Sequence, residues 1–126
     1  MTPTIDLRLP VGPLAPGDAR HALDRLTGVV GTGRLEELRL LVSELVTNSV
    51  RHAGLAPGEW IEFRVDVSGA LVRVEVADRG PGFVTARSVP SMYQDSGWGL
   101  YLVEQIADRW GVSNEGGTCV WFEVDL

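Results

Sequence analysis

Residues 40–54 read LLVSELVTNSVRHAG and belong to the longest helical pattern in the chain. Apolar residues recur there at three- and four-residue spacing, which predicts an amphipathic helix over roughly residues 33–53, ending at Gly54. Glu44 and Asn48 stand four positions apart in this helix, so their side chains are neighbours on its surface. The stretch therefore raises the question of why a helix that packs into a core carries a carboxylate and an amide.

A helical projection at about 100° per residue places Glu44 and Asn48 together at the boundary of the apolar stripe, roughly a quarter-turn from its centre. The stripe itself consists of Leu38, Leu41, Val42, Leu45 and Ser49. Two interpretations remain open for this stretch alone. The pair is either an ordinary polar flank or a pair of oxygen groups at the rim of a pocket, suited to Mg²⁺ or to a general base.

The rest of the chain alternates between strand and helix patterns, with one long irregular segment at 79–97 that is typical of a functional loop. The pattern predicts an α+β two-layer sandwich, a mostly antiparallel sheet with helices on one face, in a single domain over 1–126. The expected elements are an edge strand at 4–9, a helix at 19–29 with Asp18 as N-cap, the helix at 33–53, strands at 60–67 and 69–78, a helix at 98–111 and a strand at 116–126.

Composition excludes several classes of function. The net charge is −6, so nucleic acid and anionic membranes are not expected as partners. All 11 basic residues are Arg, so no lysine is available for chemistry.

Cys119 is the one cysteine and is expected to be a small core residue. Trp60, Trp110 and Trp121 are expected to be core or interface anchors. With no signal-peptide pattern and no long apolar run, a cytoplasmic location is expected.

The segment ADRGPGF at 77–83 ends a predicted strand with Asp78, followed closely by Gly80 and Gly82. Asp-x-Gly is a common turn, and that is the simplest interpretation. Alternatively, an Asp at a strand end can accept a hydrogen bond from an exocyclic amine such as that of adenine. The glycines would then let a flat ring approach the backbone.

The segment DSGWGLYLV at 95–103 places Gly97 and Gly99 at the start of a helix. Unpaired N–H groups and the helix dipole make such a start an anion site, although a lone Gly-x-Gly is weak support for phosphate. It fits neither the P-loop nor the dinucleotide-binding pattern. Further on, the Thr118 hydroxyl at the start of the last strand could reach a phosphate, and a hairpin turn explains that residue equally well.

Taken together, three ordered segments resemble the N box and the two glycine boxes of the GHKL ATPase superfamily, whose ATP-binding unit is the Bergerat fold. The segments are SELVTNSVRHAG at 43–54, DRGPGF at 78–83 and SGWGLYLVEQIA at 96–107. The resemblance covers the chain from about residue 33 to its end. The variant E-L-V-T-N-x-x-x-H-A in a compact chain is similar to the anti-sigma factor serine kinases of bacteria, of the kind abundant in actinobacteria.

The resemblance implies ATP and Mg²⁺ as cofactors and a role for each matching residue. Asn48 would hold Mg²⁺ bridging the phosphates, and Glu44 would be the general base. Asp78 would hydrogen-bond the adenine amino group. The other implied nucleotide-binding residues are His52, Gly80, Gly82, Phe83, Gly97, Trp98, Gly99, Leu100 and Thr118, with 83–96 as a lid.

Two of these positions carry their own alternatives. His52 is as readily a packed or capping histidine as a nucleotide contact. Trp98 departs from the family pattern, because relatives often have a small or basic residue between the two glycines. Its ring would either cover the nucleotide or crowd the triphosphate.

The function implied is a serine/threonine kinase that phosphorylates a small antagonist protein and so controls a sigma factor by partner switching. A homodimer is possible, and no direct contact with nucleic acid or membrane is implied. The alternative is a non-catalytic module whose bound ATP or ADP gates binding to a protein partner.

Overall fold

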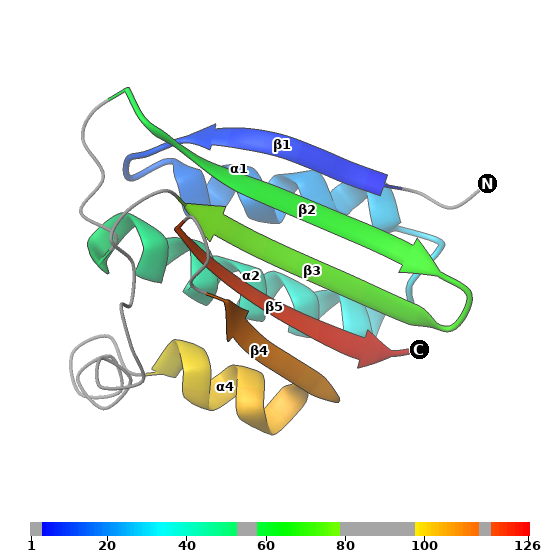
Figure 1. The fold of residues 1–126 in the computed structure, drawn as a ribbon. Coiled ribbons are helices and arrows are strands. Elements are labelled where there is room, and N and C mark those ends of the chain that lie inside the picture. Colours follow the sequence, from blue (N-terminus) through cyan, green and yellow to red (C-terminus); the bar gives the residue numbers. More distant parts are fainter. Residues whose placement is uncertain (1–3, 53–57, 79–97, 114–116) are drawn as a thin grey trace.

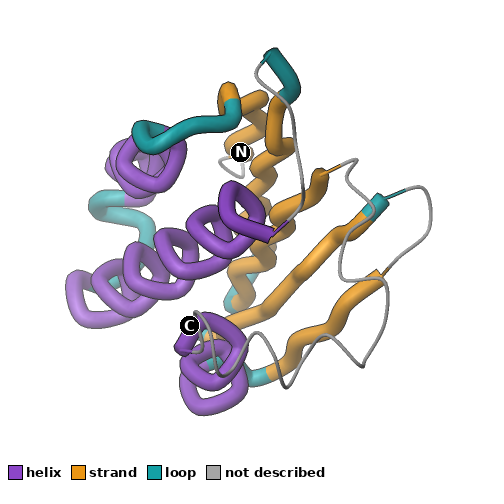
Figure 2. Tube along the Cα trace, turned by 90° about the vertical axis from the view of Figure 1, so that its left-hand side faces the viewer, coloured by secondary structure: helices purple, strands orange, loops and turns teal. Residues whose placement is uncertain are grey.

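Five antiparallel strands form one sheet in the order β1-β2-β3-β5-β4, and helices cover one face of it (Figures 1 and 2). The computed structural model describes residues 4–52, 58–78, 98–113 and 117–126. This arrangement confirms the predicted α+β two-layer sandwich. The strands are β1 (Thr4–Pro10), β2 (Trp60–Ser68), β3 (Leu71–Asp78), β4 (Arg109–Ser113) and β5 (Thr118–Asp125); the helices are α1 (Ala15–Ala22), η1 (Leu23–Leu26), α2 (Thr32–His52) and α4 (Trp98–Ile106).

The sheet forms because its longer strands alternate apolar and polar residues, so that one face is buried under the helices. Strand β1 lies at the edge, as its short alternating pattern predicts. The inward rows of the sheet meet the apolar stripe of α2 in one continuous core. Among the described residues, none of the helices is long and apolar enough to cross a membrane.

The first helix begins earlier and ends sooner than predicted. Helix α1 spans Ala15–Ala22, and Asp18 lies within its first turn instead of capping it. Pro16 accounts for the early start, because its fixed φ suits the first turn of a helix. The chain then tightens into η1, and Gly28 leaves the helical conformation with a φ of +87°.

Strand β4 was missed in the sequence, where a helix was predicted through residue 111. Helix α4 ends at Ile106, and Arg109–Ser113 pair with β5 instead. Trp110 lies opposite Phe122 in this pairing and packs against the core. The strand forms because the open edge of β5 offers hydrogen bonds and a place for Trp110, which outweigh the local helical pattern.

Two of the tryptophans expected as core or interface anchors lie on the outer face of the sheet, half-buried under arginines. The Arg8 guanidinium stacks over Trp60 at 4.7 Å, and that of Arg73 over Trp121 at 4.3 Å, both measured to the ring centroid. These cation–π contacts cover the indole faces that the helices do not reach.

Cys119 is also on the outer face and not in the core. It lies half-buried in β5, opposite Ala77 of β3 and Ser113 of β4. Burial, followed by the nearby Glu75 carboxylate, raises the pKa of its thiol. Cys119 is therefore a thiol and not a thiolate at neutral pH, and it is a poor nucleophile.

Gly111 gives the first testable prediction, because the Trp121 indole lies directly against it. A Cβ at position 111 would lie 2.8 Å from the indole nitrogen. We expect Gly111→Ala to lower the free energy of unfolding by about 1–3 kcal/mol, measured by urea denaturation. Gly33→Ala is the control, because a Cβ there meets nothing within 4 Å and alanine favours the helix. Equal stability of the two variants would contradict this account.

Candidate active site

The C-terminal half of α2 buries an amide next to the apolar core. Asn48 is only 2% exposed and Glu44 is half-buried, so the two do not share one boundary environment as predicted. The cause is rotation along the helix, because Asn48 lies about 40° closer to the apolar stripe than Glu44. Ser49, next to Asn48, is buried as well. The helix thus presents an amide at its inner edge and a carboxylate beside it, nearer to solvent.

Two more buried polar side chains lie opposite one another on the neighbouring strands β3 and β5, at one end of the sheet. Asp78 is the last residue of β3 and Thr118 the first of β5, and they are register partners. Their exposed fractions are 7% and 3%. Both continue inward rows that are otherwise apolar, formed by Val72, Val74 and Val76 in β3 and by Val120, Phe122 and Val124 in β5. At this end of the sheet, therefore, the face under the helices changes from apolar to polar.

Helix α4 begins at Trp98 and packs against α2. Leu100 and Val103 are buried three positions apart and hold one side of the helix against the core. Tyr101 on the other side is 42% exposed. The packing fixes where the first turn lies, and the backbone N–H groups of a first turn have no partners within their own helix.

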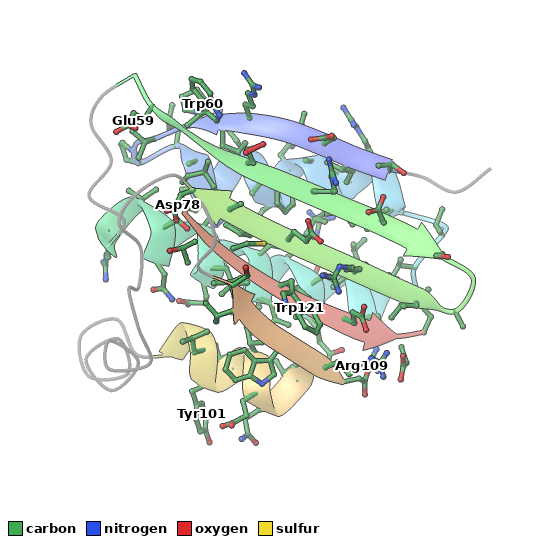
Figure 3. The ribbon with its side chains drawn as sticks, viewed as in Figure 1. Glu59, Trp60, Asp78, Tyr101, Arg109 and Trp121 are labelled. Carbon is green, nitrogen blue, oxygen red and sulfur yellow. The ribbon has the colours of Figure 1, made fainter. Side chains whose placement is uncertain are left out.

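All of these ends meet at one edge of the molecule. The last turn of α2, the end of β3, the start of β5 and the start of α4 lie at the same end of the sheet (Figures 1 and 2). Figure 3 shows Asp78 at this end, beside the last turns of α2. The fold thus brings together residues from all three sequence motifs, which are far apart in the chain.

Several predicted site residues lie outside the described part of the chain. These are Gly80, Gly82, Phe83 and Gly97, together with the side chains of His52 and Trp98. The expected lid at 83–96 lies outside it too. Their roles remain predictions.

The described polar groups at this edge come from separate elements and are rich in oxygen. Among the described residues, no group of three or more His, Cys, Asp or Glu side chains is placed to hold a metal ion. An amide, a hydroxyl and a carboxylate at the ends of separate elements instead suit a polar organic ligand, with a helix start able to accept an anion. The Glu44 carboxylate beside them is half-buried.

The chain matches known proteins over nearly its whole length. Residues 14–124 match the histidine kinase-like ATPase domain. The serine-protein kinase RsbW of Bacillus subtilis is 30% identical, over 92% of this chain and 81% of the relative. RsbW of Oceanobacillus iheyensis is 27% identical and RsbW of Bacillus velezensis 29%, with 92% of this chain covered in both and 82% and 81% of the relatives. These matches bear out the resemblance in the three motifs, and the chain belongs to the histidine kinase-like ATPase domain family.

Proposed function

We propose that this chain is an ATP-dependent serine protein kinase of the anti-sigma factor type. Its family and its similarity to kinases named RsbW support this function over a module that only binds nucleotide. The observation that carries the proposal is the burial of three polar side chains, Asn48, Asp78 and Thr118, on elements whose ends lie at the edge where α4 begins (Figure 1).

ATP would bind across this edge with its base toward the sheet. The Asp78 carboxylate would accept a hydrogen bond from the adenine amino group, with Gly80, Gly82 and Phe83 beside the ring. The N–H groups at the start of α4, around Gly99 and Leu100, would donate to phosphate oxygens. Thr118 would reach the nucleotide from β5. Burial supports the role of Asp78, because a hydrogen bond to a charged group strengthens when water is excluded.

The side chains present fit Mg²⁺ bound jointly by the protein and the nucleotide. Mg²⁺ usually takes one or two protein oxygens and completes its shell with phosphates and water. The Asn48 amide oxygen would supply such a ligand, consistent with the lack of a carboxylate cluster among the described residues. Bound Mg²⁺ would neutralise phosphate charge, which matters in a chain that has no lysine.

Glu44 would act as the general base for phosphoryl transfer. Its carboxylate would take the proton from a serine hydroxyl of the protein substrate as that oxygen bonds to the γ-phosphorus and ADP leaves. The products are phosphoserine, ADP and a proton that Glu44 passes to solvent. Half-burial suits this role, because the carboxylate borders the site and still reaches water.

The protein substrate would be a small anti-sigma factor antagonist. A sigma factor would be the alternative binding partner, and a homodimer the possible assembly. The direct test is to co-purify the chain with antagonist candidates and add γ-labelled ATP. Transfer of label to a serine of the bound protein is the expected result. Nucleotide binding without transfer to any partner that co-purifies would instead favour a nucleotide-gated binding module.

A second prediction concerns Glu44. We expect Glu44→Ala to slow phosphorylation of the antagonist by about 10²–10⁴-fold, because the attacking hydroxyl loses its base. ATP affinity, measured by calorimetry, should be retained. Glu36→Ala is the control, since Glu36 is an exposed acid on the same helix, paired with Arg39 at 3.2 Å. Unchanged phosphorylation in Glu44→Ala would refute its role as base.

A third prediction concerns Asp78. We expect Asp78→Asn to weaken ATP binding by about 10- to 150-fold, the effect of losing one hydrogen bond to a charged group. Asp66→Asn makes the same chemical change on the outer face of β2, opposite Arg73, and should leave binding unchanged. Calorimetric titration with Mg-ATP, at a temperature where both variants are folded, measures the difference. Equal affinities would remove Asp78 from the proposed base site.

A further inference from the structure

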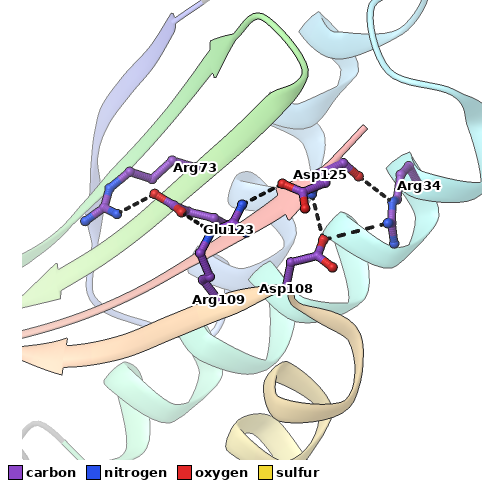
Figure 4. Close-up of polar contacts among 6 residues, drawn as sticks. All are labelled: Arg34, Arg73, Asp108, Arg109, Glu123 and Asp125. Carbon is purple, nitrogen blue, oxygen red and sulfur yellow. Dashed lines mark hydrogen bonds and ion pairs between the residues drawn. The ribbon is translucent and has the colours of Figure 1, made fainter.

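Helix α2, strand β5 and helix α4 each carry proposed site residues at one end, and they are joined to one another at the other end. Helix α2 carries Asn48 near its end, β5 begins with Thr118, and α4 begins with the glycine motif. The start of α2, the end of β5 and the chain just after α4 meet at Asp108 (Figure 4). The sequence pattern concealed this junction, because residue 108 was expected inside a helix.

Asp108 is bonded through both its backbone and its side chain. Its N–H donates to the carbonyl oxygen of Glu123 at 2.9 Å. Its Oδ2 accepts the backbone N–H of Asp125 at 2.7 Å and lies 3.9 Å from Nη2 of Arg34. Arg34 in turn donates from Nε to the carbonyl oxygen of Asp125 at 3.2 Å. One residue thus connects the end of α4 with both β5 and α2.

The hydrogen bonds to β5 are the stronger part of this junction. The side chains of Arg34 and Asp108 are 35% and 37% exposed, and a solvent-exposed ion pair at 3.9 Å contributes little. Arg109 also pairs with two side chains of β5, with Glu123 at 2.7 Å and with Asp125 at 2.5 Å, and its own side chain is 48% exposed. Hydrogen bonds from Arg109 and then Arg73 lower the pKa of the Glu123 carboxyl, which therefore stays ionised at neutral pH.

Helix α4 needs a directional contact of this kind. Its inner side is held by apolar packing at Leu100 and Val103, and the hydrophobic attraction that drives this packing is non-directional. The helix has only 9 residues and, at 1.5 Å per residue, is about 13 Å long, so its two ends move together. A bond that fixes the chain directly after its last turn therefore also restrains its first turn.

We infer that Asp108 is a positioning residue for the phosphate-binding end of α4, acting through the length of the helix. The inference rests on the proposed function, in which the first turn of α4 holds the phosphates of ATP. Phosphate contacts need placement within about 0.5 Å, whereas the adenine contact to Asp78 belongs to β3 and does not depend on α4. Loss of the Asp108 side chain should therefore affect the phosphate part of the ligand and spare the base.

The test compares binding of Mg-ATP and of adenosine, with ligand-observed NMR for the weaker ligand. We expect Asp108→Ala to weaken ATP binding about three- to tenfold, the effect of losing one hydrogen bond to a partly exposed carboxylate, and to leave adenosine binding unchanged. Asp108→Asn keeps an oxygen acceptor for the Asp125 N–H and should bind both ligands as the wild type does. Asp6→Ala is the control, since it removes an exposed Arg64 pair of 3.2 Å at the other side of the sheet.

The outcomes separate this inference from the proposed function. Wild-type protein that binds neither ligand would overturn both. Wild-type protein that binds ATP tightly, with an unchanged ATP-to-adenosine ratio in Asp108→Ala, would overturn the positioning role alone. An equal loss for both ligands would also overturn it, because that indicates general destabilisation. If Asp108→Ala does not fold, Asp108→Ser, whose hydroxyl is one bond too short for full contact, replaces it with the same expected direction.

Discussion

The packing of α2 against the sheet is the constraint on which the rest of the structure depends. This helix buries Leu38, Leu41, Val42, Leu45 and Val46, and rotating it would expose part of that surface to water. The orientation that buries these residues also places Asn48 in the interior and leaves Glu44, beside it, nearer to solvent. The proposed ligand amide and base therefore owe their different environments to apolar residues that contact neither ATP nor substrate.

The fold divides directional and non-directional contacts along its length. Apolar side chains fill the middle of the sandwich, where they set the distance and rotation of helices on the sheet. The polar groups of the proposed site and those of the Asp108 junction lie at opposite ends of the sandwich. Asp78, Thr118 and Asn48 lie at one end, and Arg34, Asp108 and Asp125 at the other. Helix α4 spans both ends. Its position along its own axis is restrained at one end, and its proposed function lies at the other.

The sequence predicted what depends on local pattern and missed what depends on distant partners. Strands β2 and β3 and helix α2 have their own strong periodicity, and their expected positions agree with the structure to within two residues. Strand β4 has only five residues, including Gly111, and it exists because β5 offers an open edge. The outward positions of Trp121 and Cys119 likewise depend on strand register, which sets the face on which each side chain lies.

The depth of the candidate site was harder to predict than its membership. The sequence motifs drew Asn48 and Asp78 into the predicted site, and the start of the last strand added Thr118 as a further prediction. The helical projection places Asn48 nearer to the apolar stripe than Glu44, but its depth also depends on what packs against α2, and both α4 and β3 contact that helix. The glycine-rich motif around Gly80 and Gly82 stays a prediction, because those residues lie outside the described part of the chain.

Electrostatics explains why an anionic ligand would choose the edge under the helices and not the open face of the sheet. That face has a hollow lined by Asp6, Glu62 and Glu75, with Arg64 as the cation among its lining residues. Arg64 already pairs with Asp6, so the hollow keeps an excess of negative charge that repels a triphosphate. In the proposed site, the start of α4 would offer partial positive charge to the phosphates, and Asp78 would contact the adenine base, which is uncharged. Of the two carboxylates in the proposed site, Asp78 would contact the uncharged adenine, and Glu44 would contact the attacking serine hydroxyl and not the phosphate oxygens themselves.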